Sequence, residues 1–167
     1  ELPSHASFFQ YFLESTKLPP TKASIITSKE KLSVLHNTKD LDWHDSYIPY
    51  TDAANRPDQE TFEISKAFLE QENPELTLIH FRGPDAFGHG KDWNGYLQSI
   101  LETDRYVGEL WKLIQENEFY KDKTSLLVTN DHGRHLDGIG SGFVGHGDRC
   151  MGCQHISLLA IGPDFTP

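Results

Sequence analysis

The stretch LLVTNDHGRH, residues 126–135, joins a buried strand to a polar end. Its first three residues are apolar and favour a strand, whereas Asp131 and His132 stand side by side where that strand would end. Gly133 follows at once and predicts a turn in the backbone. In parallel α/β sheets, ligands bind beyond the carboxyl ends of the strands. The stretch therefore predicts a core strand that carries an acid and an imidazole to the edge of a sheet.

The rest of the chain alternates between strand and helix patterns. Apolar runs predict strands at residues 22–28, 76–81, 124–130 and 156–162. Apolar residues at helical spacing predict helices at residues 7–16, 58–72 and 93–117, and Ser28 is placed to cap a shorter helix at 29–35. Strands that are separated by helices and apolar on both faces predict an α/β three-layer sandwich, with a mostly parallel sheet flanked by helices.

Residues 37–57 show no clear period. They hold three aromatic residues, Trp43, Tyr47 and Tyr50, among asparagine, aspartate and proline. We expect an irregular excursion that contributes to specificity, since loops carry such roles more often than the elements they connect.

Length and charge limit the kind of protein. The 167 residues suit a single α/β domain, which we expect to extend over residues 1–167. A net charge of −10 argues against nucleic acid or an anionic membrane as the main partner. No apolar run reaches the roughly 18 residues that a bilayer span needs. Cys150 and Cys153 are too few for a disulfide framework.

Two further groups of polar residues border predicted strands. Asp85 and His89 lie in RGPDAFGHG, residues 82–90, directly after one strand, and His146 lies in GHGDRCMGCQH, residues 145–155, directly before another. Asp85 and His89 would share a face of a helical turn, or converge through a loop that neighbouring glycines let bend. Asp131 and His132 are adjacent and would diverge, toward two metals or toward one metal from two sides. Carboxylate with imidazole suits zinc or manganese, and carboxylates also accept harder ions.

The sequence resembles the alkaline phosphatase superfamily of metallohydrolases and metallomutases. Three stretches carry the resemblance: GPDAFGHGKDWNGYLQSILETDRYVGEL, LLVTNDHGRH and GHGDRCMGCQHISLLAIGPDF. They follow the family order of Asp-x-x-x-His after one strand, Asp-His-Gly after the next, and a His-Gly before a strand that ends in Gly-Pro. The resemblance extends from about Glu75 to the C-terminus and implies an alkaline-phosphatase-like fold.

The resemblance implies a site with two divalent cations. Asp85, His89 and His146 would hold one cation, and Asp131 and His132 would hold part of the shell of the second. Zinc is the expected metal, with manganese, magnesium or calcium as alternatives, and two such ions serve in-line displacement at phosphorus. The substrate would be a small phosphate ester, or a sulfate ester if the chain belongs to the sulfatase branch. The expected substrate or outer-shell contacts are Arg82, Arg134, His135 and Arg149.

One departure from the family pattern concerns the nucleophile. The family places a further aspartate and a serine or threonine nucleophile before the segment where this chain begins at Glu1. We therefore expect a C-terminal part of a larger domain, truncated at the N-terminus, with the N-terminal remainder as its partner and no catalytic nucleophile or turnover of its own. Export of many family members favours a periplasmic or secreted location, although the sequence leaves localisation open.

Other interpretations remain open for the cysteine motif and for the histidines. His146, Cys150, Cys153 and His155 form H-x3-C-x2-C-x-H, which is compatible with a structural zinc knuckle in a non-catalytic α/β module. The cysteines are equally compatible with a local disulfide or with free thiols. Any single Asp-His pair after a strand is also typical of a turn and a helix cap.

Overall fold

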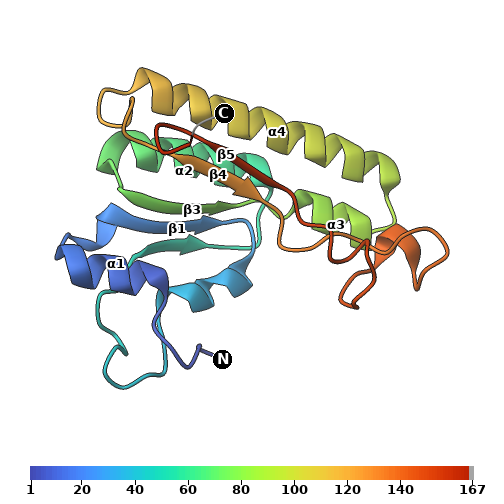
Figure 1. Ribbon diagram of the computed structural model, residues 1–167, viewed down its shortest axis with the longest axis horizontal. Helices are drawn as coiled ribbons and strands as arrows, with labels where there is room; N and C mark the ends of the chain where they lie inside the picture. Colours follow the sequence, from blue (N-terminus) through green and yellow to red (C-terminus); the bar gives the residue numbers. More distant parts are fainter. Residues whose placement is uncertain (166–167) are drawn as a thin grey trace. The chain divides into compact units, whose positions relative to one another are not determined.

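The computed structural model describes residues 1–165 (Figure 1). The internal contacts of the chain divide it into two compact units. The first unit is Glu1–Arg82 and the second begins at Gly83. The single domain expected over the whole chain stays a prediction. No described helix is both long enough and apolar enough to cross a membrane.

The first unit is built on a three-stranded parallel sheet with strand order β2-β1-β3. The strands are β1 (Ala23–Thr27), β2 (Tyr50–Ala53) and β3 (Leu76–His80). All five residues of β1 are buried, because this strand has neighbours on both edges and helices on both faces. Ile25 is paired with Thr51 on one side and with Leu78 on the other.

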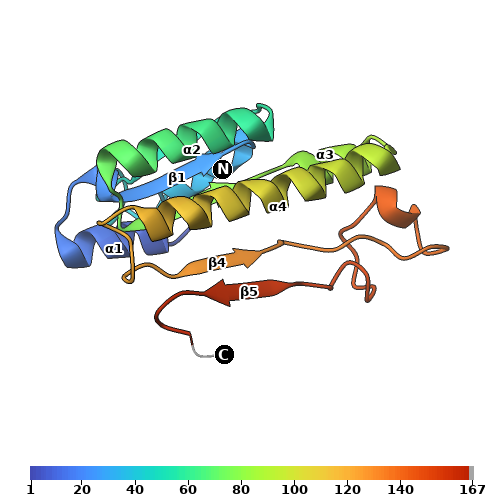
Figure 2. The same cartoon turned by 90° about the horizontal axis from the view of Figure 1, so that it is seen from above.

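Helices cover both faces of this sheet, as Figure 2 shows for α1 (Phe8–Thr16) and α2 (Asp58–Glu72). The hydrophobic core joins Phe9 and Leu13 of α1 to Ala23 and Ile25 of β1. The α/β class, with a mostly parallel sheet between layers of helices, is therefore confirmed. It is consistent with an alkaline-phosphatase-like fold.

The first helix begins and ends where its local chemistry allows. Ser7 accepts a hydrogen bond from the Gln10 N–H, and the Gln10 side chain accepts one from the Ser7 N–H, which completes a capping box. The Gln10 amide also donates to the carbonyl oxygens of Trp43 and Ser46, at 3.0 and 2.9 Å. These two hydrogen bonds connect the irregular segment that contains Trp43 and Ser46 to the helix. The helix ends at Thr16, and the capping residue Lys17 has a left-handed φ of 58°.

Two predictions for the first unit are wrong in detail. The segment 37–57 contains a regular strand, β2, which has a short sequence, YTDA, and lies half-buried at the sheet edge. An edge strand needs no long apolar run, so the apolar pattern did not reveal it. Ser28 caps no helix: its hydroxyl donates to Asp58 Oδ1 at 2.6 Å, and the helix that follows is the 3-10 helix η2 (Glu30–His36).

The second unit contains two helices and a separate pair of strands. The helices are α3 (Gly83–His89) and α4 (Trp93–Glu116), and the strands are β4 (Leu126–Thr129) and β5 (Leu158–Ile161). β4 and β5 pair in the antiparallel direction, so the expectation of parallel strands fails for this pair. Between them, residues 130–157 hold only one short described helix, η3 (Gly142–Val144), and we call this segment the 130–157 loop.

Candidate metal centre

Helix α3 presents an acid and an imidazole on one face. Asp85 and His89 are one turn apart, and His89 Nε2 lies 3.3 Å from Asp85 Oδ1. Of the two arrangements that the spacing allowed, the structure has the helical one rather than a bent loop.

The 130–157 loop brings two more imidazoles to the same point. His146 Nε2 lies 3.0 Å from His89 Nε2 and 3.3 Å from Asp85 Oδ1. The ring of His132 stacks on that of His146, with centroids 3.6 Å apart, and its Nε2 is 4.0 Å from Asp85 Oδ1. Ligand atoms of Asp85, His132 and His146 all lie within 4.8 Å of one another. Residues far apart in the sequence thus converge on one carboxylate oxygen.

Asp131 lies at the exposed rim of this cluster. Its side chain is 74% exposed, and its Oδ2 is 3.6 Å from His132 Nε2. Asp131 and His132 therefore do not diverge as the sequence suggested. His132 Nε2 lies between the two carboxylates, 3.6 Å from Asp131 Oδ2 and 4.0 Å from Asp85 Oδ1.

The distances within the cluster fit a metal ion. Zinc bonds of about 2.0–2.1 Å to nitrogen and oxygen in a tetrahedral shell separate the ligand atoms by roughly 3.3–3.4 Å. The three separations among Asp85, His89 and His146 are 3.3, 3.0 and 3.3 Å. His89 Nε2 and His146 Nε2, 3.0 Å apart, form a hydrogen bond only if one of them carries a proton. A cation bound to both nitrogens would instead accept both lone pairs.

A hydrogen bond selects the tautomer of His132, and burial affects the charge of His146. His132 Nδ1 lies 2.9 Å from the carbonyl oxygen of Gly133, which can only accept, so Nδ1 carries the proton and Nε2 is left to bind. Burial, followed by the neighbouring His132, lowers the pKa of His146, and Asp85 opposes that effect. The pKa shift favours neutral His146, which is the metal-binding form of the side chain.

Arg134 holds the Asp85 side chain of the cluster in place through hydrogen bonds. Its Nη2 donates to Asp85 Oδ1 at 2.6 Å and to the Asp85 carbonyl oxygen at 2.9 Å. Its Nη1 donates to the carbonyl oxygens of Phe143 and Val144. A Cβ at Gly88 would lie 2.2 Å from the guanidinium carbon, so this glycine makes room for Arg134 rather than bending a loop. The arginine thus orients the carboxylate.

Gly133 also has a different role from the predicted turn. Its φ lies outside the left-handed region, and a Cβ on it would lie 2.0 Å from the carbonyl oxygen of Gly152. Its N–H donates to the Cys153 carbonyl oxygen at 2.9 Å. Gly133 is therefore a point of close backbone approach between the two ends of the 130–157 loop.

The expected substrate or outer-shell roles of Arg82, His135 and Arg149 stay predictions, and the described contacts of these residues are as follows. Arg82 belongs to the first unit, where its guanidinium lies 3.5 Å from Asn55 Oδ1, and Arg149 is exposed. His135 faces Asp148, with Nε2 and Oδ2 3.4 Å apart.

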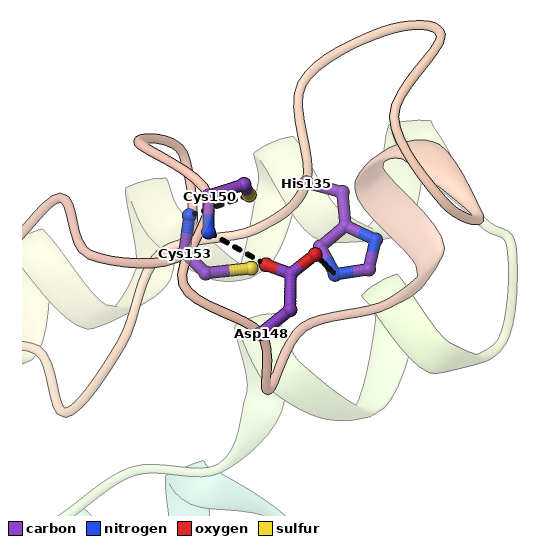
Figure 3. A group of neighbouring side chains, drawn as sticks. All are labelled: His135, Asp148, Cys150 and Cys153. Carbon is purple, nitrogen blue, oxygen red and sulfur yellow. Dashed lines mark hydrogen bonds and ion pairs between the residues drawn. The ribbon is translucent and has the colours of Figure 1, made fainter.

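The zinc knuckle of His146, Cys150, Cys153 and His155 is not assembled. His146 belongs to the cluster around Asp85, and His155 is exposed. Cys150 and Cys153 instead group with His135 and Asp148, as Figure 3 shows. The sequence did not indicate this grouping, because His135 precedes η3 in the chain whereas Asp148, Cys150 and Cys153 follow it.

Comparison with known proteins identifies the family. The family model for type I phosphodiesterase / nucleotide pyrophosphatase matches residues 5–135. This range includes Asp85, His89, Asp131 and His132, and it ends before His146. No solved structure matches the chain. The family model covers more than half of the chain, which therefore belongs to the type I phosphodiesterase / nucleotide pyrophosphatase family, within the alkaline phosphatase superfamily.

Proposed function

We propose that this chain contributes a two-metal centre to the hydrolysis of small phosphate esters. The observation that supports it is the convergence of His89 Nε2 and His146 Nε2 on Asp85 Oδ1, at 3.3 Å each. In this proposal these three residues hold one divalent cation, and Asp131 and His132 contribute to a second. Imidazole with carboxylate favours zinc, and manganese, magnesium and calcium are alternatives.

The chemistry follows from the position of the ligands. Divalent cations held by these residues would supply positive charge to the attacking and leaving oxygens of an in-line displacement at phosphorus. The chain itself orients the ligands, since Arg134 fixes the Asp85 carboxylate and the Gly133 carbonyl fixes the tautomer of His132. The family match supports phosphate diesters over sulfate esters as the substrate class.

The number of ligands differs between the two proposed ions. Asp85, His89 and His146 give the first ion three protein ligands, which is typical of catalytic zinc. Asp131 and His132 give the second ion only two. We therefore expect this chain to bind the first ion strongly and to hydrolyse no phosphate ester by itself.

Manganese binding tests the metal centre. Mn²⁺ prefers oxygen ligands and disfavours thiolates, so it probes the centre around Asp85 without occupying the cysteine group. Electron paramagnetic resonance should show Mn²⁺ bound to the native chain, and the double variant His89→Ala/His146→Ala should bind at least about 100-fold more weakly. His155→Ala is the matched control, because this histidine is exposed and should leave the affinity unchanged.

Phosphate binding tests the link to phosphate esters. Bound Mn²⁺ should broaden the ³¹P resonance of inorganic phosphate with the native chain, and the double variant should abolish the broadening. Equal Mn²⁺ affinity in the native and doubly substituted chains would contradict the proposed centre. Release of nitrophenol from bis(4-nitrophenyl) phosphate by this chain alone would contradict only the expected lack of turnover.

A further inference from the structure

A second group of ligand atoms lies in the 130–157 loop, apart from the residues assigned above. His135, Asp148, Cys150 and Cys153 each offer one ligand atom, and these atoms all lie within 4.8 Å of one another. Figure 3 shows the imidazole of His135 and the thiol of Cys153 on either side of the Asp148 carboxylate. We propose that these four residues form a structural zinc site that fixes the 130–157 loop.

The donor set determines the metal. Two thiolates, one imidazole and one carboxylate complete a four-coordinate shell, and a closed shell of this kind is typical of structural rather than catalytic zinc. Thiolates disfavour magnesium, calcium and manganese, which prefer oxygen ligands. His135 Nε2 and Asp148 Oδ2 are 3.4 Å apart, close to the roughly 3.3–3.4 Å edge of a tetrahedral zinc shell.

His135 provides independent support for a ligand at this point. Its side chain is only 11% exposed, and neither ring nitrogen has a hydrogen-bond partner among the described residues. A buried polar atom without a hydrogen-bond partner destabilises the folded chain. A bound cation satisfies Nε2 and so removes part of this cost.

The backbone around the cysteines is arranged for metal ligands. The Cys150 N–H donates to Asp148 Oδ1 at 2.9 Å, which leaves Oδ2 directed at His135. The Cys153 N–H donates to the sulfur of Cys150 at 3.4 Å, a hydrogen bond that the sulfur would keep as a metal ligand. Both sulfurs belong to free thiols in this structure, so both are available as ligands.

The position of the site in the loop gives it a role. It would join residue 135 to residues 148–153, across the turn that contains η3. His132 lies just before this closed segment and His146 lies within it. If the proposed function holds, zinc at the second site keeps both histidines in place. The zinc site itself does not depend on that function.

X-ray absorption of the purified zinc-loaded chain tests the inference. The zinc edge should show sulfur neighbours at about 2.3 Å, and Cys150→Ser/Cys153→Ser should lose both the sulfur signal and about one equivalent of zinc. His89→Ala/His146→Ala should keep the sulfur signal, which separates this site from the centre around Asp85. Met151→Ala is the matched control, because its 83% exposed side chain lies between the two cysteines and takes no part.

Cobalt substitution of the native chain needs no variant, and so remains informative if the cysteine variant fails to fold. Co²⁺ should give a near-ultraviolet thiolate charge-transfer band. Zinc without sulfur neighbours, zinc content that is equal in the native and cysteine-substituted chains, or absence of the cobalt band would each overturn the inference. The inference would also be overturned if Cys150 and Cys153 formed a disulfide and the chain took up no zinc after its reduction.

Discussion

Gly133 connects the proposed two-metal centre around Asp85 with the proposed zinc site of the 130–157 loop. Its N–H donates to the Cys153 carbonyl oxygen, and its Cα approaches the Gly152 carbonyl oxygen so closely that no Cβ fits. His132 precedes Gly133 in the chain. Cys153, whose carbonyl oxygen accepts the hydrogen bond, is a ligand of the proposed zinc site. The sequence placed a glycine after Asp-His but could not show this role, because the contact joins segments that are distant along the chain.

Alanine at residue 133 should therefore disturb both sites. The new Cβ would meet the Gly152 carbonyl oxygen at 2.0 Å, so the loop must move, at a cost of roughly 1–3 kcal/mol in the free energy of unfolding. We expect Gly133→Ala to lower the urea midpoint and to weaken Mn²⁺ binding. Gly108→Ala is the control, since a Cβ there meets no atom within 4 Å, and it should stabilise α4 by about 0.5–1 kcal/mol. Unchanged stability and Mn²⁺ affinity in Gly133→Ala would show that the loop adapts freely.

Most helices could be predicted from local sequence, whereas strand pairing could not. Helix α2 coincides with the predicted range 58–72, since its apolar spacing and its acidic first turn are local signals. The antiparallel pairing of β4 with β5 was missed, because apolar runs do not encode strand direction. The sequence likewise left open whether Asp85 and His89 lie on a helical turn or in a bent loop. The structure has the helix α3, where Asp85 contacts His146 and Arg134.

The capping box of α1 predicts a measurable effect at the scale of one element. Ser7→Ala removes the side-chain acceptor for the Gln10 N–H, so it should destabilise the chain by about 1 kcal/mol. Equilibrium unfolding in urea measures this change. Ser15→Ala is the matched control in the same helix, because its exposed hydroxyl only contacts the Phe12 carbonyl oxygen, and it should change stability little. Equal losses from both variants would exclude capping as the cause.

At the scale of the whole molecule, the two units differ in what stabilises them. The first unit has a buried parallel strand and an apolar core around Phe9 and Ile25. The second unit contains the 130–157 loop, which has little regular structure and contributes ligands to the centre around Asp85 and all four ligands of the proposed zinc site. The sequence predicted the α/β class and the family. It did not predict this division, since the apolar patterns are similar along the chain.

Removal of metal should therefore affect the two units unequally. Amide exchange in the presence of EDTA should accelerate in the 130–157 loop, where ligands would no longer hold the chain, and should remain slow in β1. Hydrogen–deuterium exchange with mass spectrometry resolves these segments. A chain with all four of His89→Ala, His146→Ala, Cys150→Ser and Cys153→Ser provides the control, because it should exchange rapidly in the loop with or without EDTA. Equal acceleration of exchange in β1 and in the 130–157 loop would mean that metal stabilises the whole chain. That result would contradict a zinc site that stabilises the loop locally.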